Sequence, residues 1–253
     1  MEKTRLKIKG LKVPPAIMLF HLSKDLEINN KFDVSFDLWP DAMSMRKDLA
    51  SSNVDLCIMP TNLSSSFYNQ GYPIKLLSVN VWGILYILSS ETHQSPWRLV
   101  EQNRIAIPLK GNMPDTIFNI LAKKQGIKNV DIKYLDTYQD ALNELINSKV
   151  KLVVLPEPYA SIAELNGKCR LINFQEDWNN VFNESNGYPQ AGVVVNSAFS
   201  DSEAIILNNT LKNSLNWMVN HSFEASQIGS EILKQDALAI KKSIKSINWN
   251  YLD

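Results

Sequence analysis

Cysteine and histidine, which often supply nucleophiles and metal ligands, are few and scattered in this sequence. Cys57 and Cys169 do not form a disulfide framework, and Cys57 lies in an apolar run, as a small buried residue does. His21, His93 and His221 are not spaced as metal ligands. The motifs GxSxG, HExxH, Walker A and GxGxxG are absent. We therefore expect no metal, no cofactor and no catalytic residues. Catalysis by an unrecognised pair of carboxylates stays open as an alternative.

Polar and aromatic residues gather where the predicted strands end. In open parallel sheets, ligands bind outside the carboxyl ends of the strands. Several of these loops also open helices, whose free N–H groups can bind an anionic or polar group. The candidate ligand contacts at these strand ends are Pro15, Trp39, Thr61, Asn62, Gly111, Asn112, Met113, Glu157 and Tyr159.

Each of these candidates also has a purely structural interpretation. Thr61 suits a helix cap, and Glu157 near a helix start suits the helix dipole without any ligand. Trp39 and Trp82 can equally be packing residues, and Gly111 can serve only its turn. The pattern therefore favours a binding cleft more strongly than it favours any single residue.

Two stretches of the chain share one order of predicted elements. The first has strands at 6–11, 32–38 and 54–59, with helices opened by Pro14-Pro15, at 41–51 and after 59. The second has strands at 104–108, 130–135 and 151–155, with helices opened near Pro114, at 138–148 and after 155. Alternating strands and helices predict mostly parallel sheets with helices on both faces, in the α/β class.

A weak internal repeat, at an ungapped offset of 96 residues, relates the two stretches. The proline and glycine that mark the ends of predicted elements keep their positions, because Pro60 falls on Pro156 and Gly71 falls on Gly167. Ser52 and Val54 similarly fall on Ser148 and Val150. We interpret this register as a structural repeat that builds two similar lobes.

The apolar run 74–88 is too long for one ordinary strand and predicts two strands with a change of direction near 80–83. We interpret it as the chain leaving one lobe and entering the other, with a return near 188–196. The predicted lobes are 1–85 plus 192–253, and 86–191. The C-terminal part is predicted as helices at 201–221 and 224–245, without a strand. Two connections between lobes form a plausible hinge.

Composition excludes several classes of protein. Of 253 residues, 45% are hydrophobic and 21% charged, which permits a core and argues against global disorder. Lys plus Arg and Asp plus Glu both number 26, so no basic excess indicates nucleic-acid binding. No run approaches the length of a membrane span. The first ten residues have no signal-peptide core, so the chain is expected to be either cytosolic or a trimmed exported protein.

Four segments resemble the substrate-binding proteins of ABC importers with the type II periplasmic-binding fold. The nearest subgroup binds nitrate, taurine, alkanesulfonates and thiamine precursors. The four segments are Asn53–Ile58 with Pro60 and Gly71-Tyr72-Pro73-Ile74; Lys110-Gly111-Asn112 before a helix ending at Gly126; Asp140-Ala141-Leu142 through Glu157-Pro158-Tyr159; and Tyr188-Pro189. The sequence departs from the family in two places. It lacks the Gly-rich loop that often follows the third strand, and it has Lys149-Val150-Lys151 where the family has its second G-x-VD motif.

The resemblance implies a two-lobed protein, with two mixed, mostly parallel sheets, that closes on a small molecule between its lobes. It implies ligand contacts at Thr61, Asn62, Trp82, Gly111, Asn112, Glu157, Tyr159 and Tyr188. It also implies a permease and an ATPase as partners, and an extracytoplasmic location, periplasmic or as a lipoprotein, with a removed signal peptide. We expect a monomer that is not an enzyme.

Two other functions stay open: an enzyme on the same fold, of the menaquinone-pathway or pyrimidine-synthase kind, and the ligand-sensing domain of a regulator. Arg and Lys are sparse in the predicted cleft, with only Lys110 close to it in sequence, and this sparsity disfavours a multiply charged anion as the ligand. Glu157 and the aromatic residues favour a small organic molecule with a donor group or a flat ring.

Overall fold

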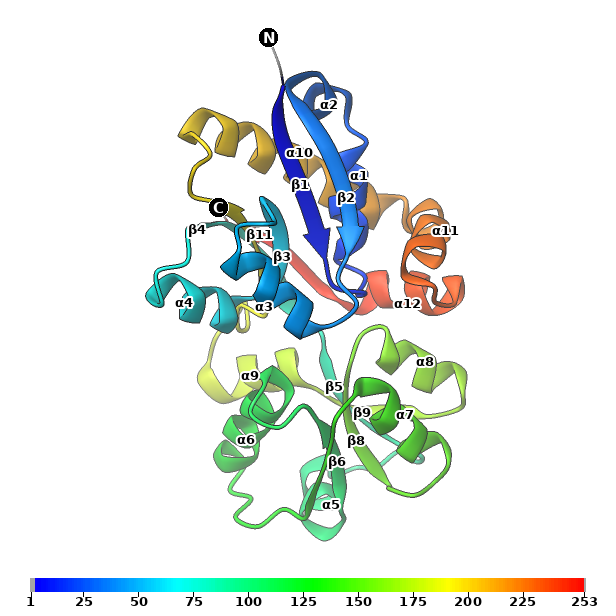
Figure 1. Cartoon of the computed structure of the whole chain (residues 1–253). Helices are drawn as coiled ribbons and strands as arrows, with labels where there is room; N and C mark the ends of the chain where they lie inside the picture. The colour runs from blue at the N-terminus through cyan, green and yellow to red at the C-terminus, as the bar shows by residue number, and fades with distance from the viewer. Residues whose placement is uncertain (1–2, 253) are drawn as a thin grey trace. The chain divides into compact units, whose positions relative to one another are not determined.

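The computed structural model describes residues 3–252, which form two compact units (Figure 1). Lobe 1 contains the chain up to Val81, the segment Pro189–Lys245 and the chain from Trp249. Lobe 2 contains Trp82–Tyr188 and Ser246–Asn248. Each lobe has its own sheet and its own covering helices, as the alternating sequence pattern predicts.

The sheet of lobe 1 has six strands in the order β11-β4-β10-β3-β1-β2. The strands are β1 (Thr4–Gly10), β2 (Phe32–Leu38), β3 (Leu56–Pro60), β4 (Ile74–Gly83), β10 (Ala191–Asn196) and β11 (Asn248–Leu252). Strands β1, β2 and β3 are parallel, and β10 runs antiparallel to both β3 and β4. The sheet is therefore mixed.

The sheet of lobe 2 has five strands in the order β7-β6-β8-β5-β9. The strands are β5 (Leu85–Ser89), β6 (Ile105–Pro108), β7 (Ile132–Leu135), β8 (Leu152–Pro156) and β9 (Cys169–Asn173). Strands β6, β7 and β8 are parallel, and β5 is antiparallel to β8 and β9. The antiparallel strand again sits between parallel neighbours.

Helices surround both sheets. Lobe 1 has α1 (Ala16–Ser23), α2 (Leu26–Lys31), α3 (Ala42–Ala50), α4 (Thr61–Asn69), α10 (Asp201–Asn220), α11 (Ser222–Leu233) and α12 (Ala237–Ser246). Lobe 2 has α5 (Pro96–Gln102), α6 (Met113–Lys124), α7 (Tyr138–Ile146), α8 (Tyr159–Leu165) and α9 (Phe174–Phe182). The last residue of α12, Ser246, already belongs to lobe 2.

The sequence repeat corresponds to repeated structure over part of its length. Helices α3 and α7, and strands β3 and β8, begin and end at the expected offset (138 minus 42, and 152 minus 56, are both 96). Ser52 and Ser148 both adopt a positive φ, at 50° and 56°, and Gly71 and Gly167 do so at 84° and 75°. The match fails at β7, which starts only at Ile132.

The chain passes between the lobes within the long apolar run. Only Ile84 separates β4 from β5, so the predicted division into two strands is confirmed. The lobe boundaries fall at Val81/Trp82 and Tyr188/Pro189, a few residues before the expected 85/86 and 191/192.

A further connection, not expected from the sequence, occurs at Ser246–Asn248. The Tyr86 hydroxyl of lobe 2 donates a hydrogen bond to the Ser246 carbonyl at 2.6 Å, which ties this turn to lobe 2.

The C-terminal region differs from the prediction in two ways. A strand, β11, follows the helices, and its Trp249 and Tyr251 donate hydrogen bonds to the carbonyls of Ile244 and Asn208. The predicted second helix is also broken, because Lys234 adopts a positive φ of 57° between α11 and α12. The polar–aromatic alternation of residues 248–251 was an available signal for the strand. Helix α9 was likewise unexpected.

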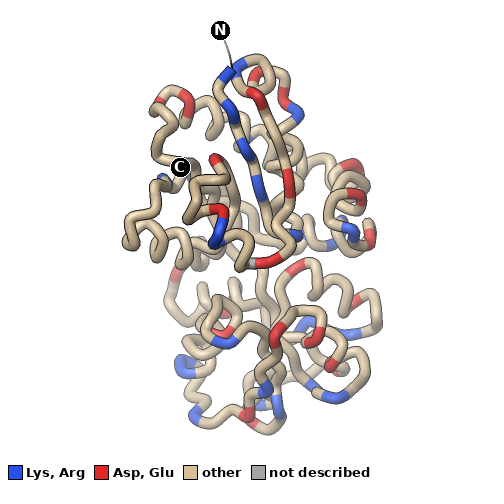
Figure 2. The backbone as a smooth tube through the Cα atoms, in the orientation of Figure 1, with Lys and Arg blue, Asp and Glu red and all other residues tan. Residues whose placement is uncertain are grey.

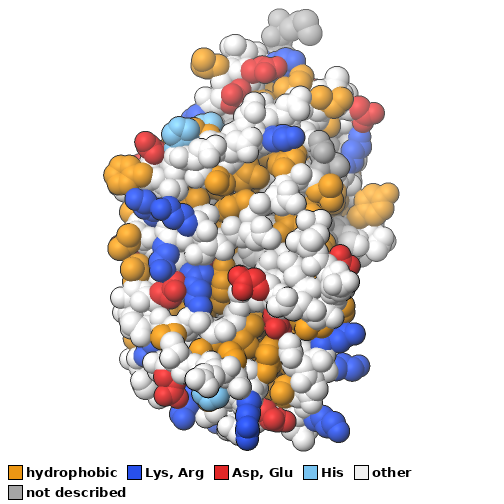
Figure 3. Space-filling model, turned by 180° about the vertical axis from the view of Figure 1, so that it is seen from behind, with side chains coloured by type: hydrophobic (Ala, Val, Ile, Leu, Met, Phe, Trp, Pro, Cys, Tyr) orange, Lys and Arg blue, Asp and Glu red, His pale blue; other side chains and the backbone are white. Residues whose placement is uncertain are grey.

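Strands β1 and β2 carry opposite charges at facing positions. The parallel register places Arg5 opposite Asp33 and Lys9 opposite Asp37 (Figure 2). Opposite charges on facing positions of neighbouring strands stabilise the pairing modestly. Seen from behind, the surface carries acidic, basic and apolar side chains interspersed with one another (Figure 3).

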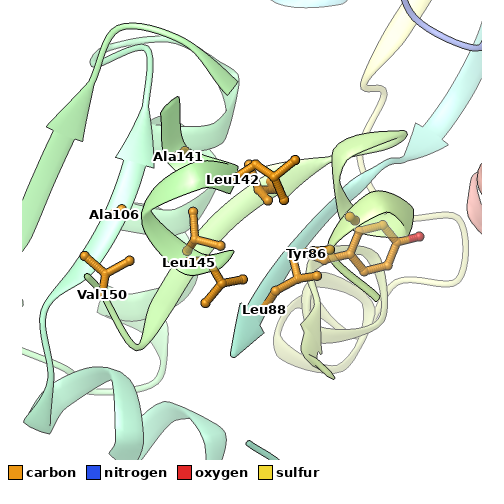
Figure 4. Packing of buried hydrophobic residues seen from close by; sticks show 11 residues of the cluster. Tyr86, Leu88, Ala106, Ala141, Leu142, Leu145 and Val150 are labelled. Carbon is orange, nitrogen blue, oxygen red and sulfur yellow. The ribbon is translucent and has the colours of Figure 1, made fainter. Parts of the chain in front are cut away.

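Helix α7 supplies much of the core of lobe 2. Ala141, Leu142 and Leu145 lie on one face of the helix and pack against buried residues of β5 and β6, including Leu88 and Ala106 (Figure 4). The spacing of these apolar positions matches the helical period, so the sequence alone predicts the buried face. This packing fixes the start of α7 beside the end of β7.

An aromatic stack in lobe 1 generates a prediction about pH. His21 on α1 stacks on Trp217 of α10 with ring centroids 4.1 Å apart, and its Nδ1 lies 3.0 Å from the Ser214 hydroxyl. Burial lowers the pKa of His21, nearby Asp25 raises it, and His221 lowers it further, for a net decrease. The folded protein therefore resists protonation of His21 more than the unfolded chain does.

Because the unfolded chain then binds more protons, stability should fall as pH drops through about 6.5, the unfolded value, toward the lower folded pKa. Urea unfolding of wild type and His21→Gln at about pH 7.5 and about pH 5 measures this difference. We expect wild type to lose more stability than the variant on acidification, while the exposed-site variant His93→Gln behaves as wild type. Equal losses in wild type and His21→Gln would contradict the assignment.

Candidate functional site

Four of the predicted contacts lie at one edge of the lobe 1 sheet, where β1, β2 and β3 end. Pro15 is the N-cap residue of α1 and is buried. Trp39 follows β2, and Thr61 and Asn62 are the first two residues of α4. The loops that the sequence placed at strand ends are therefore confirmed as strand-end loops within this lobe.

The start of α4 is the more open part of this edge. Asn62 is exposed, and α4 has neither a side-chain cap nor an acidic residue in its first turn. The Thr61 hydroxyl donates a hydrogen bond to the Pro189 carbonyl, so it ties α4 to the segment that precedes β10. Thr61 does not cap its own helix, contrary to the structural interpretation of this residue.

Trp39 is part of the lobe 1 core. It is 2% exposed, and its indole N–H donates to Asp48 Oδ2 at 2.7 Å. Lys9 and Asn53 also donate to the Asp48 carboxylate. Burial opposes ionisation of Asp48, but these hydrogen bonds lower its pKa to about 2. Of the two interpretations of Trp39, the structure therefore favours packing, with the side chain holding the end of β2 in place.

The corresponding edge of lobe 2, here called the carboxyl edge, is where β6, β7, β8 and β9 end and β5 begins. Pro108 pairs with Leu135, and Leu85 pairs with Pro156, which brings these strand ends together. Helices α6, α7, α8 and α9 all begin at this edge. The predicted contacts in this lobe are Trp82, Gly111, Asn112, Met113, Glu157, Tyr159 and Tyr188.

The loop before α6 is organised by a carboxylate. Asp115, 6% exposed, accepts hydrogen bonds from the Gly111 N–H at 2.8 Å, from Asn119 Nδ2 at 2.7 Å and from the Tyr134 hydroxyl at 3.0 Å. Gly111 has a positive φ of 77°, a conformation that side chains resist. The Lys110 ammonium lies 4.8 Å from the Tyr134 ring centroid. Asp115 thus places a negative charge in the first turn of α6, where the helix dipole favours one.

Glu157 belongs to a buried ion-pair network. It is fully buried, its Oε1 lies 2.6 Å from Arg170 Nη2, and its Oε2 accepts from the Ser161 N–H at 3.1 Å. Arg170 also pairs with Glu164 at 2.8 Å and lies 4.1 Å from the Tyr86 ring centroid. Burial disfavours the charge on Arg170, yet Glu157 beside it leaves its pKa raised. This geometry favours the structural interpretation of Glu157, as an anchor for α8 and β9.

Tyr159, the first residue of α8, is a predicted contact whose aromatic side chain is partly exposed. Its ring centroid lies 5.5 Å from that of Tyr138, the first residue of α7. Burial raises the pKa of both hydroxyls, so both are neutral near pH 7. The two rings form an aromatic surface at adjoining helix starts.

Gln175 of α9 fills the space beside both segments that lead into and out of the main body of lobe 2. A Cβ placed on Gly83 would lie 2.5 Å from its Oε1, and one on Gly187 would lie 1.4 Å from its Nε2. Its Nε2 donates to the Asn186 carbonyl at 2.7 Å. The absence of side chains at both glycines is therefore what admits Gln175.

Several buried polar atoms have no hydrogen-bond partner among residues 3–252, and three of them belong to side chains that are at least nine-tenths buried in this part of lobe 2. These three are Trp82 Nε1, Gln175 Oε1 and Tyr188 Oη, on side chains that are 9%, 4% and 3% exposed respectively. Tyr188 packs against Trp178, with ring centroids 5.1 Å apart. Because Gln175 touches the glycines next to Trp82 and Tyr188, the three residues belong to one corner of lobe 2.

Arg170, Gln175 and Asp115 were not predicted from the sequence. A negative charge beside a glycine turn was an available signal for Asp115. Arg170 lies on β9, whose residues are mostly half-buried, and Gln175 lies on helix α9, which was not expected. Neither residue therefore has a sequence pattern around it that indicates its role.

The described residues, 3–252, contain no group of three or more His, Cys, Asp and Glu side chains that could hold a metal ion. Within the same range, no helix combines the length and apolarity needed to cross a membrane.

Comparison with known proteins finds similarity in structure only. No family model matches the chain, and no curated protein matches it. A crystal structure of an ABC transporter from Parabacteroides distasonis has a TM-score of 0.84 at 22% identity, over 99% of this chain and 86% of the other.

Two further structures bear on the resemblance noted in the sequence. The periplasmic aliphatic sulphonate binding protein SsuA from Escherichia coli has a TM-score of 0.80 at 14% identity, over 99% of this chain and 86% of the other. The periplasmic nitrate-binding protein NrtA from Synechocystis has a TM-score of 0.72 at 15% identity, over 96% and 70%. These similarities confirm the expected fold, that of periplasmic binding proteins.

The Glu157–Arg170 pair gives a stability prediction. Arg170→Ala leaves a fully buried carboxylate without its counter-charge, which should lower the free energy of unfolding by about 3–5 kcal/mol. The matched control is Arg104→Ala, since the Arg104–Asp131 pair is more than half exposed and should contribute about 0–1 kcal/mol. Urea unfolding measures both. Similar losses in the two variants would contradict a structural role for the buried pair.

The packing of Gln175 gives a second stability prediction. Gly187→Ala places a methyl group on the Gln175 side chain and should cost about 1–3 kcal/mol more than Gly167→Ala. Gly167 is a matched control because it has a similar φ, 75° against 76°, and nothing within 4 Å of its Cβ position. Adding Gln175→Ala should recover part of the loss in Gly187→Ala. Equal thermal denaturation midpoints for the two glycine variants would refute the packing argument.

Proposed function

We propose that this chain is the solute-binding component of an ABC importer, which captures a small organic molecule between its two lobes and delivers it to a membrane permease. The observation that carries this proposal is the fold. Two α/β lobes, joined where β4 passes into β5, match over nearly the whole chain the structures of an ABC transporter component and of sulphonate- and nitrate-binding proteins.

The mechanism we propose is closure of the lobes upon the solute. Each lobe presents strand-end loops of its own, with the start of α4 in lobe 1 and the starts of α6 to α9 in lobe 2. A solute that contacts both sets of loops stabilises the closed state over the open one, in proportion to its difference in affinity for the two. The permease then distinguishes loaded from empty protein by their shapes.

The same proposal covers partners and location. We propose that a permease and an ATPase are the partners, that the chain acts as a monomer, and that it works outside the cytoplasm, in a periplasm or as a lipoprotein. The periplasmic binding proteins of similar fold support this location.

An enzyme on the same fold and a ligand-sensing domain are the alternatives. Two observations favour binding over catalysis. Burial raises the pKa of the Cys57 thiol, which keeps it protonated and unreactive. The Glu157 carboxylate is engaged by Arg170 and the Ser161 N–H, so it is poorly placed to move protons.

The proposal predicts binding without turnover. A thermal-shift screen of the purified protein against a library of small nutrients should give an upward shift for one chemical class, since a solute at about 100 times its Kd adds about 2.7 kcal/mol of stability. Mass spectrometry should recover that solute unchanged. Consumption of the solute would instead identify an enzyme.

Tyr159→Ala tests the site with the same solute. Loss of one aromatic face should weaken binding about fivefold in calorimetry, measured at a temperature at which the variant is still folded, because Tyr159 also packs against the core of lobe 2. The control is Tyr68→Ala in lobe 1, whose side chain is 66% exposed. Equal affinities for wild type and Tyr159→Ala would remove Tyr159 from the site.

A further inference from the structure

The helices that begin at the carboxyl edge of lobe 2 each carry their own carboxylate. Asp115 lies in the first turn of α6, Asp140 in that of α7, and Glu176 and Asp177 in that of α9, while Glu157 precedes α8. A helix start attracts anions, so a carboxylate already there competes directly with an anionic ligand.

Three of these carboxylates accept hydrogen bonds from donors at this edge. Asp115 accepts the Gly111 N–H, and Glu157 accepts the Ser161 N–H. Asp140 accepts a hydrogen bond from the Thr137 hydroxyl at 2.6 Å. An anion brought to this edge would therefore meet like charges, and it would find the Gly111 and Ser161 N–H groups already engaged.

The basic side chains near the edge do not reverse this balance. Arg170 is paired with both Glu157 and Glu164. Lys110 lies over the Tyr134 ring, next to the Asp115 carboxylate that accepts the Tyr134 hydroxyl. Neither supplies an excess of positive charge.

A separate observation concerns hydrogen bonding. Trp82 Nε1, Gln175 Oε1 and Tyr188 Oη have no partner among residues 3–252, although each side chain is at least nine-tenths buried. Buried polar atoms in native proteins nearly always have a partner in the protein, in water or in a ligand. The set offers an indole donor, an amide acceptor and a hydroxyl that can do both.

We propose that the part of the solute held by lobe 2 is uncharged or cationic and presents neighbouring donor and acceptor atoms, as an amide or a nitrogen heterocycle does. The Gln175 amide oxygen accepts a hydrogen bond from the solute, and the Trp82 indole and the Tyr188 hydroxyl make the solute's remaining hydrogen bonds. This inference rests on the proposed function and narrows its solute class. It separates the chain from the sulphonate- and nitrate-binding proteins that share its fold.

The first test compares charge classes on one skeleton. Nicotinate, nicotinamide and 1-methylnicotinamide, together with amides and nitrogen heterocycles such as cytosine and adenine, are titrated by calorimetry beside nitrate, sulfate, methanesulfonate and benzenesulfonate. We expect binders only among the neutral and cationic compounds. Binding of nicotinate or of any of the inorganic or sulfonate anions with a Kd below about 10 μM overturns the inference but leaves the proposed function intact. A panel without any binder overturns this inference if the nutrient library yields a solute of another class, and the absence of a binder from both panel and library contradicts the proposed function as well.

The second test uses Gln175 with the tightest neutral binder and its N-methylated cation. Gln175→Ala should weaken the neutral compound about tenfold, whereas Gln102→Ala, at an exposed position of α5, should not. Gln175→Glu keeps the shape and adds a charge, so it should shift the ratio of affinities about tenfold toward the cation. A ratio equal to that of wild type means that Gln175 only packs, and contradicts its place in the site.

Discussion

The structure depends on one stretch of extended chain that belongs to two sheets. Strand β4 pairs within lobe 1 and β5 pairs within lobe 2, with Ile84 alone between them. β4 ends at the same edge of its sheet as β3, because both strands are antiparallel to β10. β5 starts where β8 ends, since Leu85 pairs with Pro156. The chain therefore leaves the loop-bearing edge of one sheet and enters the next sheet at its own loop-bearing edge.

Local interactions then fix the loops at these edges. In lobe 1, Asp48 holds the indole of Trp39, and Thr61 holds the segment before β10. In lobe 2, Asp115 shapes the turn at Gly111, and Arg170 compensates the buried charge of Glu157. Loops held by buried polar networks keep their geometry without a ligand, which reduces the entropy lost when a solute binds.

The sequence predicted what local physics determines. The period of α7 and the division of the run into β4 and β5 both follow from patterns within a few residues. The repeat at offset 96 identified α3 with α7 and β3 with β8 for the same reason.

Residues whose roles depend on distant partners were out of reach. Arg170 reaches Glu157 only because β9 lies beside β5, and Gln175 matters only because two glycines converge on it. Trp39 was equally compatible with packing and binding until its contact with Asp48 was seen. Strand β11 pairs with β4, which is far from it in the sequence, so the pairing could not be predicted although the alternating pattern of β11 was visible.

Lobe closure on a solute is the central claim, and small-angle X-ray scattering tests it most directly. The protein is measured alone and saturated with the solute that stabilises it in the thermal screen. The account predicts a smaller radius of gyration for the saturated protein, with the solute recovered intact afterwards. An unchanged scattering curve at saturation would contradict closure as the mechanism of capture.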